Sequence, residues 1–222
     1  MLSLVATPIG NLADITLRAL ETLKAADVIA CEDTRHSLRL LQHYEIRKPL
    51  VSYHAHNEAK RTAELIEQLA EGKHIAVISD AGLPGISDPG HRLLRACQER
   101  GLAYTIIPGP SAVLTALVGS GFDAEQCYYG GFLPVKSGGR EREILAAGTR
   151  AETSIFFEST HRILKTLAVC AEKLPDRELC VARELTKTFE EYRRGTGAEL
   201  LAHYTTHPPK GEIVLVIRGA PG

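Results

Sequence analysis

The feature that most constrains the fold is the segment 74–119, in which a strand, a loop and a helix follow one another twice. The apolar run 75–78 predicts a buried strand, and 104–107 predicts a second. Loops rich in glycine and proline, 79–88 and 108–112, follow these strands. In an open α/β sheet, ligands bind outside the carboxyl ends of the strands. We therefore expect a small-molecule pocket between the two loops, at neighbouring strand ends.

The first loop contains two glycines with the spacing of a phosphate-binding loop, Gly85 and Gly90. A P-loop needs Lys and Ser or Thr directly after the second glycine, where this chain has His and Arg. Asp88 adds a negative charge and Pro89 removes an N–H donor, so both oppose an anion. We expect Asp88 to cap the following helix, with Pro89 at its first position. The loop favours an adenosine-bearing ligand without phosphate, such as S-adenosylmethionine; the alternative is a pair of ordinary turns without a ligand.

Composition excludes several broad classes of protein. The apolar content of 44% and charged content of 24% are typical of a globular protein. The net charge of -1 gives no general attraction to nucleic acid or membrane, so any contact with nucleic acid must be local. Five widely separated cysteines predict buried thiols rather than a disulfide or zinc framework. Met1 leads directly into a strand and no apolar run is long enough to span a bilayer, so we expect a cytoplasmic protein.

The N-terminal half alternates strands with helices. The expected strands before residue 74 are Leu2–Ala6, Asp27–Cys31 and Leu50–Tyr53. The expected helix caps are Asp14 or Thr16, then Thr34 and Asn57. Since each strand is followed by a polar or Gly/Pro-rich loop and then a helix, the pattern predicts a parallel, doubly wound α/β sheet.

The C-terminal half has a different pattern. Strands are expected at 154–157, 179–183 and 213–217, after a short aromatic segment at 128–133 and a flexible basic loop at 134–140. Thr196 and Glu199 predict a capping box for a helix at 197–204. Because the regular alternation with long helices is lost, we expect a mixed or antiparallel sheet. The predicted domains are an N-terminal α/β domain, 1–120, and a C-terminal α/β domain, 121–222.

Short motifs run through nearly the whole chain in a fixed order. They are Thr7-Pro8-Ile9-Gly10-Asn11-Leu12, Glu32-Asp33-Thr34-Arg35, His54-x-His56-Asn57, Ser79-Asp80-Ala81-Gly82-x-Pro84-Gly85-Ile86-Ser87-Asp88-Pro89-Gly90, Pro108-Gly109-Pro110-Ser111-Ala112, Gly131-Phe132-Leu133-Pro134, Phe156-Phe157-Glu158-Ser159, Ala182-Arg183-Glu184-Leu185-Thr186-Lys187 and Lys210-Gly211-Glu212. This series resembles the ribosomal RNA small-subunit methyltransferase I family, part of the tetrapyrrole methylase superfamily.

The resemblance implies both a fold and an activity. The fold would have two domains with the cofactor in the cleft between them, and the chain would form a homodimer. The cofactor would be S-adenosylmethionine, and the product a cytidine methylated on its ribose 2′-oxygen in 16S rRNA. The partner would be 16S rRNA or the small ribosomal subunit, and no metal or membrane would be needed. Relatives would also carry a segment after the last strand that contributes to RNA binding.

The resemblance also assigns the cofactor-binding residues. They are Pro8, Asp80, Ala81, Gly82, Leu83, Ile86, Ser111 and Ala112 in the first half, and Phe157 and Leu185 in the second. A sulfonium is best held by carbonyl groups and apolar walls that leave the methyl group a free line to its acceptor. For the large apolar side chains in this set, the alternative is plain core packing.

A ribose hydroxyl must lose its proton as the methyl group arrives, so a nearby base would help. The candidate bases are Asp33 and Glu184, and the candidate electrostatic partners are Arg35 and Lys187. The alternative for Asp33 and Arg35 is a local ion pair with Glu32 that caps a helix. Positioning could also supply most of the rate without any single essential base.

Candidate substrate-binding residues are mostly basic side chains. They are Arg35, His54, His56, Lys136, Arg140 and Arg183. The two histidines have the i, i+2 spacing of a possible metal site, but no third ligand lies nearby in sequence, so RNA contacts or a helix start are the better interpretation. Two alternatives to rRNA methylation are open: a tetrapyrrole or protein-side-chain methyltransferase, and a non-catalytic S-adenosylmethionine-binding module that associates with ribosomes.

Overall fold

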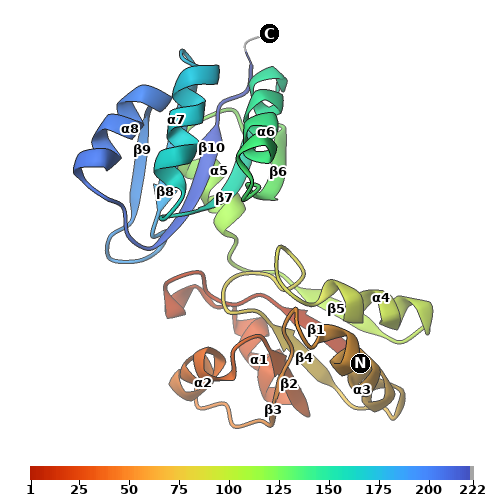
Figure 1. Cartoon of the computed structure of the whole chain (residues 1–222). Helices are drawn as coiled ribbons and strands as arrows, with labels where there is room; N and C mark the ends of the chain where they lie inside the picture. The colour runs from red at the N-terminus through yellow and green to blue at the C-terminus, as the bar shows by residue number, and fades with distance from the viewer. Residues whose placement is uncertain (221–222) are drawn as a thin grey trace. The chain divides into compact units, whose positions relative to one another are not determined.

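The structure is a computed structural model that describes residues 1–220. The chain divides into two compact units, Met1–Ser111 (unit 1) and Ala112–Gly222 (unit 2) (Figure 1). Each unit is built on its own five-stranded sheet. The predicted boundary near residue 120 lies at the far end of α5, Ala112–Ser120, a helix that packs against the sheet of unit 2.

Unit 1 contains a parallel sheet with strand order β3-β2-β4-β1-β5. Its elements are β1 Leu2–Val5, η1 Leu12–Asp14, α1 Leu17–Ala25, β2 Val28–Cys31, α2 Thr34–His43, β3 Leu50–Ser52, α3 Glu58–Ala70, β4 Ile75–Ile78, α4 His91–Glu99 and β5 Tyr104–Ile107. In the central register, Leu2 pairs with Ile75 on one side and with Tyr104 on the other. The predicted parallel, doubly wound sheet is confirmed.

The helices of unit 1 cover both faces of the sheet, because alternate strand residues point to opposite sides. Ile75 and Val77 pack in one core with α3 and α4, whereas Ala76 and Ile78 pack in the other with α1 and α2. The connection after β1 therefore runs over one face and the connection after β4 over the other. Since β1 and β4 are neighbours, the topological switch point lies between their carboxyl ends.

Three helix starts of unit 1 differ from the sequence prediction. Asp33, not Thr34, caps α2, and its carboxylate accepts the backbone N–H of Arg35 at 2.8 Å. Asn57 precedes α3, but its side chain accepts the backbone N–H of His54 at 2.9 Å and makes no cap hydrogen bond. Helix α4 begins after Gly90, so Asp88 and Pro89 stand before the helix and the predicted cap is wrong.

Unit 2 contains a mixed sheet with strand order β6-β7-β10-β8-β9. Its remaining elements are β6 Cys127–Phe132, α6 Ser137–Thr149, β7 Thr153–Ser159, α7 Ile163–Lys173, β8 Glu178–Arg183, β9 Glu191–Thr196, α8 Gly197–Thr206 and β10 Glu212–Ile217. Strands β6 and β7 are parallel, and the other pairs are antiparallel. The predicted mixed sheet and the capping box of α8 are both confirmed.

The sequence prediction missed several elements of unit 2. Helices α6 and α7 and strand β9 were not expected, so the alternation of strands and helices continues further than predicted. The prediction of a flexible basic loop is also wrong from Ser137 onward, because the residues that follow form the first turn of α6. Apolar side chains of α6, α7 and α8 cover one face of the sheet, including Ile144, Leu167 and Leu200.

All five cysteines are free thiols. Four are buried as predicted, but Cys127 on β6 is exposed. Burial raises the pKa of the Cys170 thiol to about 12 and that of Cys180 to about 11. Within residues 1–220, no helix is both long enough and apolar enough to span a bilayer.

Candidate functional site

The loops after β1 and β4 are joined by backbone hydrogen bonds at the switch point. The N–H of Thr7 donates to the carbonyl of Gly82 at 2.9 Å, and the N–H of Gly82 donates to the carbonyl of Thr7 at 3.1 Å. We call this pair the Thr7–Gly82 bridge. The Thr7 hydroxyl also donates to the carbonyl of Ser79 at 3.1 Å. Gly82 has φ +80°, a conformation in which glycine is favoured, so this position constrains the residue type.

The loop after β5 meets this bridge from the other side. A Cβ on Gly82 would lie 3.8 Å from the carbonyl oxygen of Pro110, and one on Gly109 would lie 2.8 Å from the Cβ of Ala6. The two predicted loops are therefore close. The expectation that β4 and β5 are neighbouring strands is wrong. Strand β1 lies between them, and its own loop forms the middle of the candidate site.

The glycine spacing of the β4 loop has a structural explanation. The N–H of Gly85 donates to the carbonyl of Pro89 at 3.1 Å, which closes a turn ahead of α4. A Cβ on Gly90 would lie only 3.2 Å from the Gly85 nitrogen, and Gly90 has φ +136°. Both glycines therefore permit a tight turn, and their G-x-x-x-x-G spacing does not indicate a phosphate cradle.

Carboxylates gather at the same edge of the sheet. Glu32 follows β2, and Asp80 and Asp88 follow β4; the N–H of Asp33 donates to Asp80 Oδ1 at 3.2 Å. Burial raises the pKa of Asp88 to about 6, and the charges of Glu32 and Asp80 add to the rise. Burial and the charge of Asp80 also raise the pKa of Glu32. This edge therefore favours a positively charged ligand over a phosphate.

Replacing Asp88 by Asn should remove a pH-dependent cost of folding. Because its pKa is raised on folding, Asp88 contributes stability at pH values below its ordinary pKa of 3.8. This contribution is lost as the pH rises through about 6. We expect Asp88→Asn to increase the free energy of unfolding by about 1 kcal/mol at pH 8, because partial exposure screens much of the full effect. At pH 3.5 the two proteins should differ little.

Urea denaturation of Asp88→Asn at both pH values tests this expectation. The matched control is Asp14→Asn, at an exposed carboxylate in η1. An equal pH dependence of stability in the parent chain and in Asp88→Asn would contradict the placement of Asp88 among the other carboxylates.

A small cavity lies beside the Thr7–Gly82 bridge. Its volume is about 30 Å³, and its walls include Pro8 and Asp80 from the predicted cofactor set, together with Thr7 and Ser37. This volume corresponds to about one water molecule, so the cavity is far too small for a nucleoside. It marks the inner end of the candidate site in unit 1 rather than the whole of a cofactor pocket.

Asp33 is held in structural interactions. Its carboxylate caps α2 and receives two hydrogen bonds from the Arg35 guanidinium, at 2.9 and 3.2 Å. These bonds lower the pKa of Asp33 to about 2. This is the helix-capping ion pair that the sequence left open as the alternative to a base. The Arg35 side chain is 90% exposed, so its guanidinium is open to solvent while it binds Asp33.

Glu184 and Lys187 form a second ion pair, in the β8–β9 loop of unit 2. Lys187 Nζ lies 2.8 Å from Glu184 and 2.9 Å from Glu212, and Glu184 also accepts the N–H of Glu212 at 3.1 Å. Burial raises the pKa of Glu184, but the hydrogen bonds from Lys187 and Glu212 outweigh it and the net shift is downward. Glu184 has φ +50°. Both side chains thus hold the loop against β10.

The other predicted residues of unit 2 have mixed environments. Leu185 is buried at 6% exposure, and Phe157 is half-buried with its ring edge against Tyr129 and Phe132. Arg183 binds Glu191 at 3.1 Å and the carbonyl of Lys210 at 3.1 Å. Their roles toward cofactor and substrate stay predictions.

The predicted RNA-binding residues separate into exposed and buried side chains. Lys136 is exposed ahead of α6, but Arg140 lies in the first turn of α6 and is only 6% exposed. His54 and His56 follow β3 in a turn, with ring centroids 5.9 Å apart. Among the described residues, no three potential ligands are grouped as a metal site.

The remaining predicted cofactor residues lie in the loops that follow β1, β4 and β5, or directly after them. Pro8 is buried, whereas Ile86 is 45% exposed and Ala81, Leu83, Ser111 and Ala112 are half-buried. Ile86 is therefore not a core residue. Sequence reasoning missed Thr7 and the grouping of Glu32 with Asp80 and Asp88, although it had noted that the charge of Asp88 opposes an anion. Thr7 could have been found from its place directly after β1, but the mutual influence of the carboxylates needs the strand order.

The fold is that of an α/β protein with a topological switch point between β1 and β4, where the candidate site lies. A family model for tetrapyrrole (corrin/porphyrin) methylases matches residues 1–201. "Ribosomal RNA small subunit methyltransferase I" of Synechocystis is 48% identical over 99% of this chain and 79% of its own length. The relative of the same name from Thermotoga maritima is 44% identical over 98% of both chains.

The chain therefore belongs to the ribosomal RNA small subunit methyltransferase I family, within the tetrapyrrole methylases. Solved structures of more distant proteins share the fold. The methyltransferase CobJ has a TM-score of 0.73 at 19% identity and covers 99% of this chain and 94% of its own. Uroporphyrin-III-C-methyltransferase from Thermus thermophilus has a TM-score of 0.67 at 22% identity, covering 97% of this chain and 93% of its own. The chain is a methyltransferase.

Proposed function

We propose that this methyltransferase uses S-adenosylmethionine to methylate the ribose 2′-oxygen of a cytidine in 16S rRNA. The observation that carries the proposal is the switch-point edge of unit 1, where the Thr7–Gly82 bridge and the Glu32, Asp80 and Asp88 carboxylates lie together. The substrate is inferred from the name of relatives that are 44–48% identical over nearly the whole chain.

The chemistry of this edge fits a sulfonium nucleoside. S-adenosylmethionine carries positive charge on its sulfonium and amino groups and has no phosphate. Carboxylates with raised pKa values favour such a ligand, since a nearby positive charge favours their ionised form. Backbone carbonyls around Gly82 and the half-buried Ser111 can orient polar groups. When bound, the cofactor supplies the methyl group.

The role of the protein is to orient the acceptor oxygen and to exclude competing groups. Holding the reactants in line converts a bimolecular step into an effectively unimolecular one, which can supply several kcal/mol of the barrier. Arg35 presents an exposed guanidinium at the same edge and can bind a phosphate of the substrate strand. Asp33 is held by Arg35 and Glu184 by Lys187, which favours positioning over general-base catalysis by either carboxylate.

Methyl transfer from labelled S-adenosylmethionine tests the proposed function. The substrates offered in parallel are small ribosomal subunits, free 16S rRNA and a porphyrinoid. We expect label on RNA in at least one of the first two samples, and nuclease digestion should release it as a 2′-O-methylcytidine. The homodimer and cytoplasmic location implied by the sequence stay predictions.

Each alternative has its own outcome in this assay. Label on the porphyrinoid alone would reject RNA as the substrate, and label on the proteins of the small subunit alone would indicate a side-chain methyltransferase. Cofactor binding by calorimetry with no label in any sample would indicate the non-catalytic module.

A further inference from the structure

A basic strip extends along the outer side of α2, away from the switch-point edge. Arg35 stands at the start of this helix, Arg39 one turn later, and Arg47 and Lys48 follow after its end. A helix of ten residues is about 15 Å long, so the strip connects the site edge to the opposite edge of the sheet. We call Arg39, Arg47 and Lys48 the α2 strip.

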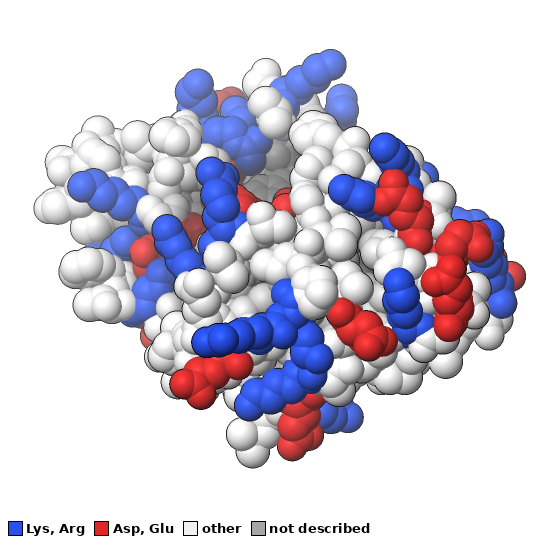
Figure 2. Space-filling model, turned by 90° about the horizontal axis from the view of Figure 1, so that it is seen from below, with Lys and Arg blue, Asp and Glu red and all other residues white. Residues whose placement is uncertain are grey.

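The charges of the α2 strip have no acidic partners among residues 1–220 and lie in a basic stretch of sequence. Arg39, Arg47 and Lys48 make no ion pair within the part of the chain that the structure describes, whereas many other surface cations do. Residues 34–49 include four Lys or Arg and a single acidic residue, Glu45, in a protein of net charge -1. Figure 2 shows several Lys and Arg side chains next to one another on the face it displays, with Asp and Glu side chains beside them.

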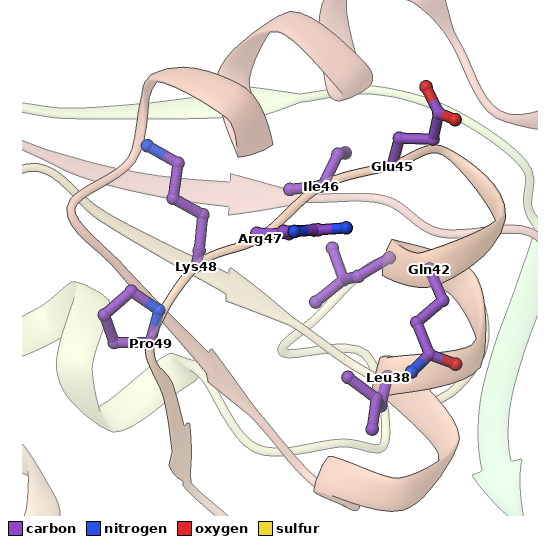
Figure 3. A pocket seen from close by; sticks show the side chains of 8 residues that line it. Leu38, Gln42, Glu45, Ile46, Arg47, Lys48 and Pro49 are labelled. Atoms are coloured by element: carbon purple, nitrogen blue, oxygen red, sulfur yellow. The ribbon is translucent and has the colours of Figure 1, made fainter.

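An open hollow lies between the end of α2 and the segment leading to β3. Its volume is about 1110 Å³, and its lining includes Leu38, Ile46, Arg47 and Lys48. Leu38 is 44% exposed, so part of the lining is an uncovered apolar surface. Figure 3 shows the Arg47 side chain extending across the middle of the hollow, with Lys48 and Glu45 on opposite sides.

We propose that the α2 strip and this hollow bind a single-stranded segment of the RNA substrate outside the site of methyl transfer. The inference rests on the proposed function for the identity of the RNA. Cations without acidic partners suit the phosphates of a strand that runs along α2 and past its end, and an apolar floor under a guanidinium suits an unstacked base. Arg35, at the helix start, links this surface to the candidate site.

The test measures binding to 16S rRNA directly, so that it does not depend on methylation. The triple variant Arg39→Gln/Arg47→Gln/Lys48→Gln should bind at least tenfold more weakly at 150 mM salt than the parent chain. The slope of log affinity against log salt should become shallower by about two, since each phosphate contact on a single strand contributes about 0.7. Affinity for S-adenosylmethionine, measured by calorimetry, should not change.

The matched control removes the same charge elsewhere. Lys60→Gln/Arg95→Gln/Lys165→Gln changes three exposed cations on α3, α4 and α7, and RNA affinity should stay within twofold of the parent. In methylation assays the α2-strip variant should raise KM and leave kcat within about twofold.

Three outcomes would overturn the inference. They are equal loss of RNA affinity in both triple variants, no loss in the α2-strip variant, and loss of binding to assembled subunits with unchanged binding to free 16S rRNA. The last result would indicate a protein contact. If the parent chain binds RNA through the strip but transfers no methyl group to it, the proposed function fails and the binding surface stands.

Discussion

The variant Gly82→Val is expected to bind S-adenosylmethionine about ten- to a hundredfold more weakly than the parent chain. Gly82 has φ +80°, which a β-branched side chain adopts only at a cost of about 1–3 kcal/mol. Its neighbours in the protein do not forbid a side chain, because a Cβ would lie 3.6 Å from Ile9 and 3.8 Å from Pro110. The loop can relieve this strain by breaking the Thr7–Gly82 bridge. The free energy of cofactor binding must then be used in part to form the bridge again.

Isothermal titration calorimetry measures this loss, and Gly101→Val is the matched control. Gly101 also has a positive φ, +63°, and a Cβ there would meet nothing within 4 Å. It lies after α4, at the end remote from the loops that follow the strands. We expect this control to lose a similar amount of stability and to keep its cofactor affinity. Unchanged affinity in Gly82→Val would show that the cofactor does not depend on the bridge.

The second large effect concerns stability, and it arises from a buried ion pair in unit 2. Glu158 is 3% exposed; its carboxylate contacts the Arg162 guanidinium and accepts the Thr166 hydroxyl at 2.6 Å. Arg162 also donates to the carbonyl of Leu133 at 3.1 Å. Removing one partner leaves the other charge without compensation, so Glu158→Ala should lower the free energy of unfolding by about 3–5 kcal/mol.

Urea denaturation followed by circular dichroism measures this change, and hydrogen exchange of β7 amides should place the loss in unit 2. Glu99→Ala is the control, because it breaks the exposed Arg95–Glu99 pair and should cost under about 1 kcal/mol. Adding Arg162→Met to Glu158→Ala should recover part of the loss. A loss in Glu158→Ala no larger than that in the control would contradict the burial of this pair.

Much of unit 1 could be predicted from sequence because its signals are local. The run Ile75–Ile78 is apolar at every position, and a strand buried on both faces requires that pattern. The start of α4 could not be predicted in the same way. Asp88 and Pro89 look like a helix cap, but the turn closed by Gly85 and Pro89 delays the helix until His91. The pattern of apolar residues along the sequence does not indicate the hydrogen bond that closes this turn.

The candidate site was less predictable than the fold, since it depends on strand order. Sequence places the β4 and β5 loops at strand ends, but it does not show that β1 separates them. Asp33 illustrates a second limit. Its position after a strand suits a base equally well as a cap, and only the contacts to Arg35 distinguish the two. Arg140 was misplaced because Ser137-Gly138-Gly139 has the composition of a loop, although it begins α6.

The Thr7–Gly82 bridge consists of main-chain groups alone, and this has a consequence for how the chain can change. Most substitutions alter side chains and leave amide and carbonyl groups in place. The hydrogen bonds between the loops after β1 and β4 are therefore kept. Position 82 resists replacement through its backbone angle. Side chains around the bridge can therefore be replaced, which would alter the ligands that the protein binds while the backbone that joins the two loops stays the same.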